Sequence, residues 1–278
     1  MFELPEYLTL AKQINATLQG KTIRRGQLGN SPHKFVWYNR SHEEFEILAE
    51  GKVIGEARVM GRFMSIPLEP GYVLLLGECG GKVLYHPPGE KLPKKYHLYL
   101  HFENDSFFTV TTQMWGAMEL YETGEEMKRE YVRGMATTPV EPGFTFEYFD
   151  ALLDELSERK ARSVKSLLTQ EQTIPGLGNA IAQDIMFTAR LHPRYPVSKL
   201  VPEQRKALYK AIVDTVAEIT EKGGRYDESD LYGEPGGYVR LMDKEALKRP
   251  CPACGGEVVK IQYLGGACYL CERCQPSP

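Results

Sequence analysis

The chain has 278 residues, which is enough for two domains that each bury a hydrophobic core. Its 34 Lys and Arg residues against 37 Asp and Glu residues leave a formal net charge of −3, so a polyanion could be bound only by cations gathered on one face. No run approaches the ~18 consecutive apolar residues of a membrane span, and the first residues lack the features of a signal peptide. We therefore expect a monomeric cytoplasmic protein that makes no contact with membrane.

The first stretch, MFELPEYLTLAKQINATLQG, predicts an amphipathic helix at the N-terminus. Pro5 is tolerated in a first helical turn, apolar residues recur at helical spacing, and Gly20 lies where a C-terminal cap belongs. Glu3 and Glu6 lie within a few residues of the terminal amine. The stretch is therefore either a reactive terminus, a former reactive terminus, or merely the start of a helix.

From about residue 21 to residue 120 the pattern changes to short β-rich runs separated by turn residues. Such runs include KFVWYN, YVLLLGE, KVLYH, YHLYLHF and FFTVTT. Runs at this spacing predict a sandwich or barrel. The stretch GMATTPVEPGFTF, with two prolines and two glycines, then marks a domain boundary.

Helical patterns follow the boundary. They cover EYFDALLDELSERKARSVKSLLTQ, NAIAQDIMFTARL and VPEQRKALYKAIVDTVAEITEKGG. The expected fold class is therefore α+β and multidomain. We place an N-terminal helix and β-sandwich at 1–133, a linker at 134–145, a helical domain at 146–235 and a cysteine-rich end at 236–278.

Two of the predicted helices meet at a GLGN turn. Its glycines permit a close backbone approach, and Asn179 opens the second helix, where free N–H groups favour an anion such as phosphate. An ordinary helical corner with an asparagine cap explains the same residues equally well.

Five of the six cysteines lie between Cys251 and Cys274, which suits metal ligation better than a disulfide framework. Cys251 and Cys254 form one C-x-x-C pair, Cys271 and Cys274 form another, and the sixteen residues between the pairs predict a hairpin. Four thiolates so arranged can surround a structural zinc ion. Cys268 and Cys271 also have C-x-x-C spacing, so spacing alone allows Cys268 to replace Cys274.

Together these features resemble the formamidopyrimidine-DNA glycosylase and endonuclease VIII family over nearly the whole chain. The resemblance is carried by ELPE at the N-terminus, the helix pair with GLGN and HP, and a C-x2-C-x16-C-x2-C hairpin that ends in CQ. It implies a helix-two-turn-helix domain, a zinc finger, binding of double-stranded DNA and a role in base excision repair of DNA damage. It also selects Cys251, Cys254, Cys271 and Cys274 as the ligands of a structural Zn²⁺.

The resemblance places the family's chemistry at the N-terminus, and there the chain departs from the family. The family's nucleophile is an N-terminal proline exposed by removal of methionine, whereas this chain has the bulky Phe2, which disfavours that removal. The candidate amine is then that of Met1, with Glu3 matching the glutamate that transfers protons. One added residue moves the amine by up to ~3.8 Å, and a misplacement of ~1 Å already costs about a hundredfold in rate.

Other family positions depart as well. Arg62 stands at the position of a catalytic lysine; arginine keeps the charge and can bind phosphate, but it cannot transfer a proton. Glu78 replaces an intercalating methionine, Trp115 a wedge phenylalanine, Met114 an arginine that contacts the orphaned base, and Gly266 the finger arginine. The joint loss predicts that the reaction has been relaxed or replaced.

Asn179, Arg62 and Trp115 remain as candidate nucleic-acid-binding residues. A sparse set of local cations accompanies them, which predicts weak affinity at physiological salt: Lys94, Lys95, Arg159, Lys160, Arg162, Lys248 and Arg249.

Three hypotheses follow. The first is a DNA-binding family member with impaired or absent glycosylase and AP lyase activity. The second is an active repair enzyme that uses the Met1 amine. The third is a scaffold that binds RNA or a protein, with Trp115 and Phe2 as exposed contact residues.

Overall fold

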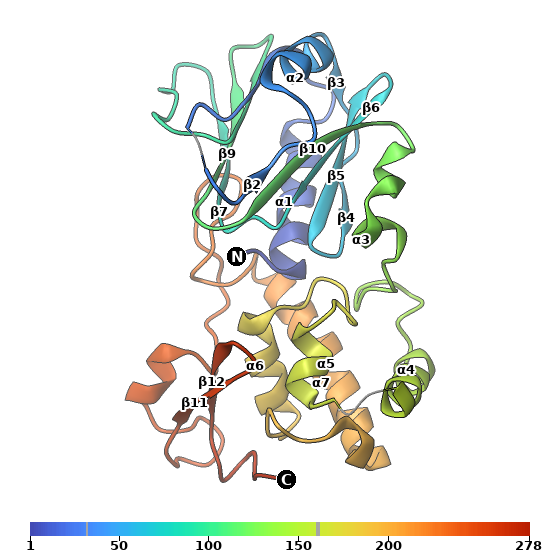
Figure 1. Ribbon diagram of the computed structural model, residues 1–278. Coiled ribbons are helices and arrows are strands. Elements are labelled where there is room, and N and C mark those ends of the chain that lie inside the picture. Colours follow the sequence, from blue (N-terminus) through green and yellow to red (C-terminus); the bar gives the residue numbers. More distant parts are fainter. Residues whose placement is uncertain (32, 160–161) are drawn as a thin grey trace. The chain divides into compact units, whose positions relative to one another are not determined.

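The computed structural model describes residues 1–31, 33–159 and 162–278. By its internal contacts the chain divides into two compact units (Figure 1). The first contains Met1–Met135 and Thr220–Tyr238, and the second contains Ala136–Ile219 and Val239–Pro278. This division differs from the predicted ranges, because a segment after residue 219 packs with the sandwich and the cysteine-rich end packs with the helices.

Helix α1 (Leu4–Thr17) opens the first unit, as predicted. It begins after Glu3, whose backbone N–H donates to the Glu6 carboxylate at 2.9 Å, and Pro5 lies in its first turn. Its Tyr7 and Ile14 are fully buried. Gly20, just past the helix, has a φ of 82°, a conformation that glycine adopts without steric cost.

Two sheets form the predicted sandwich. One has the order β1-β8-β9-β7, and the other has the order β2-β10-β6-β5-β3, with β4 paired to β5. The strands are β1 (Ile23–Leu28), β2 (Val36–Trp37), β3 (Val53–Ile54), β4 (Arg58–Met60), β5 (Phe63–Glu69), β6 (Tyr72–Gly77), β7 (Gly81–His86), β8 (Leu98–Phe102), β9 (Phe107–Thr112) and β10 (Gly116–Glu122). Short helices accompany them: α2 (His42–Ala49), η1 (Glu125–Lys128) and α3 (Glu130–Arg133).

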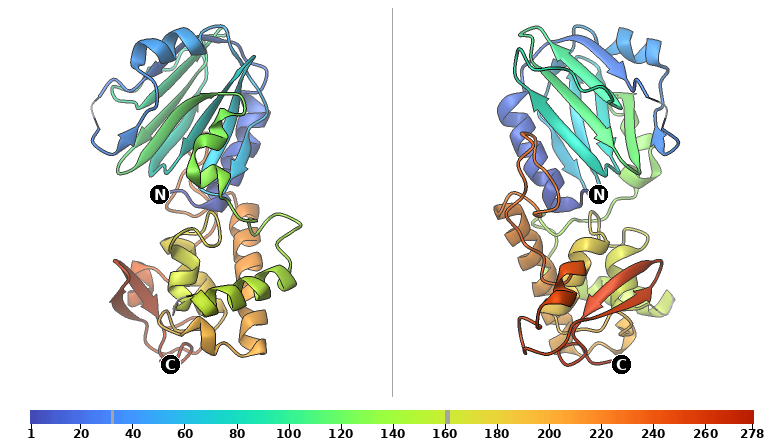
Figure 2. Two further views of the ribbon diagram at one scale, coloured as in Figure 1. Left: turned by 45° about the vertical axis from the view of Figure 1, so that its right-hand side comes forward. Right: turned by 90° about the vertical axis from the view of Figure 1, so that its left-hand side faces the viewer.

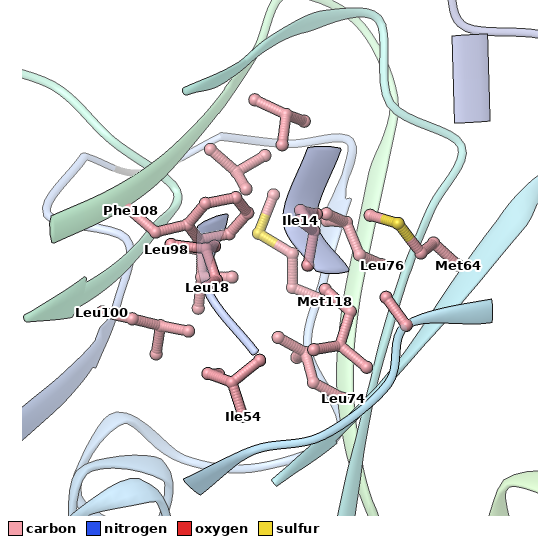
Figure 3. Close-up of a cluster of buried hydrophobic side chains, with 14 of the residues drawn as sticks. Ile14, Leu18, Ile54, Met64, Leu74, Leu76, Leu98, Leu100, Phe108 and Met118 are labelled. Carbon is pink, nitrogen blue, oxygen red and sulfur yellow. The ribbon is translucent and has the colours of Figure 1, made fainter. Parts of the chain in front are cut away.

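The core of this unit lies between the sheets and α1. Figure 3 shows Ile14 of α1 and Leu18, the residue after it, among side chains from strands of both sheets. The strand residues labelled there are Ile54, Met64, Leu74, Leu76, Leu98, Leu100, Phe108 and Met118. Alternate residues of β8 point inward, which is the period of a strand with one buried face.

The second unit combines helices with a hairpin. Its helices are α4 (Phe146–Arg159), α5 (Val164–Thr169), α6 (Asn179–Thr188), η2 (Val197–Lys199), α7 (Pro202–Glu221, whose last two residues belong to the first unit) and η3 (Lys244–Lys248). Strands β11 (Val259–Tyr263) and β12 (Gly266–Leu270) form the antiparallel hairpin expected in the cysteine-rich end (Figure 2). The Tyr269 N–H donates to Oε1 of Gln183 at 2.8 Å, which fastens the hairpin to α6.

Among the described residues, no helix has both the length and the apolar character that a membrane span requires.

Candidate nucleic-acid interface and metal centre

Phe2, at the family's proline position, belongs to the core. Only 1% of its surface is exposed, and its ring meets the Tyr7 ring edge-on with 5.9 Å between centroids. Its backbone N–H donates to the Cys79 carbonyl at 2.9 Å. The hypothesis that Phe2 is an exposed contact residue is therefore wrong: its ring is large and apolar, and burying it against Tyr7 removes it from water.

The amine of Met1 is held by a carboxylate. Its nitrogen lies 2.6 Å from Oε1 of Glu228, and the Met1 carbonyl accepts a hydrogen bond of 2.9 Å from Arg225. Met1 also lines a cavity of about 370 Å³, together with Gly80, Gly81 and Glu228. An ammonium bound to a carboxylate has no lone pair, so this amine must lose a proton and leave Glu228 before it can attack a sugar carbon.

Arg225 organises the N-terminus from within the protein. Its side chain is 2% exposed and binds Glu6 through Nε at 3.0 Å and Nη2 at 2.9 Å. The Arg225 backbone N–H donates to the same carboxylate at 3.0 Å. Glu3 and Glu228 lie 3.8 Å and 3.6 Å from the guanidinium. The candidate proton-transfer residue Glu3 is thus buried beside a permanent cation. Sequence analysis missed Arg225, because no local pattern pairs it with a helix more than two hundred residues earlier.

The buried ion pair predicts a specific acid sensitivity. Burial raises the pKa of Glu6, but the charge and hydrogen bonds of Arg225 outweigh burial, so this pKa lies below the ordinary 4.5. The resulting stability is present above pH 4.5 and is lost as the pH falls through the lower folded pKa. We therefore expect the free energy of unfolding of the first unit, measured in urea, to fall as the pH is lowered through that range. Tryptophan emission can follow it, because both tryptophans of the chain belong to this unit. An Arg225→Met/Glu6→Gln double variant should lack this component; equal acid sensitivity in both proteins would contradict the assignment.

Two of the departing family positions pair with each other. Arg62 Nη2 lies 2.8 Å from Oε1 of Glu78, and both side chains are mostly buried. The Arg62 guanidinium also lies 5.9 Å from the centre of the Tyr131 ring, and the Arg62 backbone N–H donates to the Tyr131 hydroxyl. A phosphate would therefore have to compete with Glu78 for Arg62.

Trp115 lies in an exposed aromatic group. Its ring stacks on Trp37 with 5.2 Å between centroids and 12° between planes, and it lies 4.7 Å from Phe35. Trp115 is 37% exposed and Trp37 is 44% exposed. Glu78 lines the same hollow as both tryptophans, so the structure brings two of the predicted residues, Arg62 and Trp115, into one region through Glu78.

The predicted phosphate-binding turn lies in the second unit. Asn179 is the exposed first residue of α6, and the N-cap position, predicted for Asn179, belongs to Gly178. A Cβ placed on Gly266 would lie 3.4 Å from Oδ1 of Asn179 and 3.5 Å from Nζ of Lys165. Lys165, a buried residue of α5, donates to the Tyr263 carbonyl at 2.6 Å. The tip of the hairpin, a lysine and the N-terminus of α6 thus converge, and N–H groups with an ammonium suit an oxygen anion.

Sequence analysis missed Lys165, because its position in a predicted helix does not reveal that its ammonium meets the hairpin. Of the predicted cations, Lys94 and Lys95 are exposed, and three others are already engaged. Arg162 pairs with Glu171, Lys248 with Glu245, and Arg249 donates to the Arg240 carbonyl. Lys160 and the side chain of Arg159 lie outside the described residues.

Four cysteines gather at the base of the hairpin. The Sγ atoms of Cys251, Cys254, Cys271 and Cys274 all lie within 4.8 Å of one another. Cys251 and Cys274 are 3.8 Å apart at sulfur, and Cys254 and Cys271 are 3.5 Å apart. A tetrahedral zinc ion with Zn–S bonds of about 2.3 Å requires S···S distances of ~3.8 Å, so the cluster fits a metal ion. Cys268 is buried on β12 and lies outside the cluster, which removes the alternative ligand set.

Comparisons with known proteins agree with this arrangement. Residues 1–118 match the formamidopyrimidine-DNA glycosylase N-terminal domain, and residues 135–229 match the formamidopyrimidine-DNA glycosylase H2TH domain. The formamidopyrimidine-DNA glycosylase of Bacillus licheniformis is 29% identical, with 99% of each chain covered, and that of Oceanobacillus iheyensis is 27% identical, with 100% of this chain and 98% of the relative covered.

Solved structures show the same likeness. The MutM (Fpg) protein of Thermus thermophilus superposes with a TM-score of 0.82 at 26% identity, and 99% of each chain is covered. A Lactococcus lactis Fpg in complex with DNA containing an abasic site shares the fold, with a TM-score of 0.85 at 20% identity over 99% of this chain and 100% of that one. With both domains matched in order and a four-cysteine cluster at the end, the chain belongs to the formamidopyrimidine-DNA glycosylase family.

Proposed function

We propose that this protein binds DNA and has lost the glycosylase and AP lyase reactions of its family. The observation that carries the proposal is the burial of Phe2 at the position where the family needs a terminal nucleophile. Its nitrogen is an amide that donates to Cys79, and an amide is no nucleophile. The remaining amine, on Met1, is bound to Glu228.

DNA is the favoured ligand for two reasons: the chain belongs to a family of DNA glycosylases, and the second unit places Asn179 where a phosphate can bind. Relatives of this chain are DNA glycosylases, and one solved neighbour holds DNA with an abasic site. In this chain, the exposed Asn179 at the N-terminus of α6 lies where a phosphate oxygen is favoured, and the buried Lys165 ammonium, bound to the Tyr263 carbonyl, adds positive charge beside it. Several of the other predicted cations are engaged by carboxylates or carbonyls, so affinity should be modest at physiological salt.

We further propose that the metal is zinc and that its role is structural. Cys251, Cys254, Cys271 and Cys274 would hold it, which leaves no open coordination position for chemistry. Bound zinc would fix the two ends of the hairpin and so position Gly266 beside Asn179 and Lys165.

The test compares binding with cleavage on the same DNA. A labelled duplex with an abasic site is titrated with the protein at two salt concentrations, and strand cleavage is followed in parallel with the Bacillus licheniformis relative as positive control. Salt-sensitive binding without cleavage is expected. Strand cleavage above background would overturn the proposed loss of the AP lyase reaction. Absence of affinity for any DNA would overturn the proposed DNA binding.

One observation favours a second candidate, an enzyme that uses Met1. The amine lines a cavity of about 370 Å³ and so lies where a small ligand can enter. A variant with one glycine added before Met1 moves the amine by up to ~3.8 Å while all side chains stay. If the parent cleaves DNA and this variant does not, the Met1 amine is the nucleophile. If both cleave equally, the Met1 amine is excluded as the nucleophile.

Glu78→Gln should strengthen DNA binding. The substitution removes the carboxylate that holds Arg62, so the guanidinium can contact a phosphate. The slope of log Kobs against log salt should steepen by about 0.9, with severalfold tighter binding at low salt. Glu50→Gln, at the exposed end of α2, makes the same change in net charge and should leave the slope unchanged. Equal slopes in the Glu78 variant and the parent would exclude Arg62 from the interface.

A further inference from the structure

Three exposed aromatic rings form a continuous surface on the first unit, here called the aromatic platform: Phe35, Trp37 and Trp115. The rings come from two distant segments, which meet because β2 runs parallel to β10 with Trp37 beside Ala117. The ring planes of Trp37 and Trp115 are stacked and nearly parallel, at 12°, and the Phe35 ring is tilted by 43° from that of Trp115. All three are more than a third exposed, which is unusual for such large apolar side chains that lie together.

The platform continues the cavity at Met1. A hollow of about 490 Å³ lies against Phe35 and Trp115, and another of about 410 Å³ lies against Trp37 and Trp115. The first of these shares Gln113 and Met114 with the cavity at Met1, and Trp115 is common to both hollows. Three hollows therefore follow one another, and each shares a wall with the next.

The charges along this path favour a polyanion most at the middle hollow, against Phe35 and Trp115. The cavity at Met1 is lined by Lys82 but also by the carboxylates of Asp227 and Glu228, of which Glu228 binds the Met1 amine. In the middle hollow the Lys34 ammonium lies 5.6 Å from the centre of the Phe35 ring. The last hollow contains two carboxylates, but each is bound by an arginine. Glu78 pairs with Arg62, and Glu119 pairs with Arg129. Phosphates are thus attracted at the middle hollow, beside Lys34, and meet paired carboxylates at the last one.

We propose that the platform binds the unpaired bases of single-stranded DNA. Exposed aromatic faces gain by stacking on free base faces, whereas the bases of a duplex are already stacked on each other. The path of three hollows leads an unpaired strand from the Met1 cavity across Trp115 to Trp37. The proposal rests on the proposed DNA binding and adds to it a preference for unpaired over paired strands.

The two tryptophans make the test specific to this site. The chain contains two tryptophans, and both belong to the platform, so tryptophan emission reports this surface alone. The protein is titrated with oligo-dT of about twelve nucleotides, within the usual site size of such surfaces, and with a duplex of the same length. Single strands should quench the emission and bind more tightly than the duplex.

Variants separate stacking from general attraction. Trp115→Ala should weaken oligo-dT binding at least about tenfold, measured by anisotropy of a labelled strand, because one stacked base is lost. Trp115→Phe keeps an aromatic face and should restore most of the affinity. Ile47→Ala removes an apolar side chain that is 74% exposed on α2 and should bind as the parent does. Thermal melting checks that the variants fold.

The outcomes distinguish this inference from the proposed function. Salt-sensitive binding of the duplex with unchanged emission, or equal affinity of the parent and Trp115→Ala for oligo-dT, overturns the platform and leaves DNA binding standing. Quenching by an aromatic peptide but not by oligo-dT likewise overturns it, in favour of a protein partner. Failure of all DNA to bind overturns both proposals together.

Discussion

Replacing Arg225 with methionine should lower the free energy of unfolding of the first unit by about 3–5 kcal/mol. The guanidinium is 2% exposed and faces Glu6, Glu3 and Glu228. Without it, Glu6 stays buried with no cation, and the Met1 carbonyl loses a donor. Urea unfolding followed by tryptophan emission measures the loss.

Two further variants show whether burial and pairing cause that loss. Arg24→Met breaks an ion pair with Asp105 in which both side chains are about half exposed or more, so it should cost under about 1 kcal/mol. Adding Glu6→Gln to Arg225→Met removes the unpaired buried charge and should recover part of the stability. If Arg225→Met lowers the free energy of unfolding no more than Arg24→Met does, the buried Arg225 ion pairs do not stabilise the first unit as proposed.

Replacing Cys271 with serine should abolish stoichiometric metal binding and unfold the end of the chain. Cys271 is one of four thiols whose spacing fits a tetrahedral ion. Structural zinc contributes on the order of 10–16 kcal/mol of apparent binding free energy in small zinc domains, so the hairpin should not persist without it. Native mass spectrometry measures the number of metal ions bound per chain, and limited proteolysis shows whether residues 251–275 are folded.

Cys268→Ala is the matched control, because Cys268 is buried on β12 but lies outside the cluster. This variant should keep one metal ion and its resistance to protease. Loss of the metal in Cys268→Ala, or its retention in Cys271→Ser, would show that the ligand set is assigned wrongly.

Local patterns predicted the parts of the fold that depend on local physics. Proline and apolar spacing predicted α1, short β-rich runs between turn residues predicted the sandwich, and paired cysteines around a hairpin predicted the metal cluster. The grouping of residues 220–238 with the sandwich could not be predicted, because it depends on contacts between distant segments. One such contact is the hydrogen bond from the Leu231 N–H to Gln13.

The site shows the same limit. The sequence identified Phe2, Arg62, Glu78 and Trp115 as departures from the family and weighed them as a joint loss, but it could not show which of them contact each other. The structure shows that Arg62 and Glu78 pair with each other, and that Phe2 fills the core. Arg225, the residue that orders the N-terminus, had no local signal at all. Substitutions that compensate one another in space are invisible to motif comparison.

These compensations bear on how the family scaffold has changed. In the first unit, Phe2 is buried in the core and Arg62 forms an ion pair with Glu78, so these residues have partners within the unit. In the second unit, Gly266 at the tip of the hairpin lies beside Asn179 and Lys165. This contrast between the two units supports the proposal that the protein binds DNA without the family's reaction.

Borohydride trapping on a duplex with an abasic site tests the loss of chemistry most directly. Reduction converts any Schiff base between an amine and the sugar into a stable covalent adduct, whose mass identifies the residue. We expect no adduct above background under conditions that trap the Bacillus licheniformis relative. An adduct through the Met1 amine would contradict it and would make this protein a repair enzyme with a displaced nucleophile.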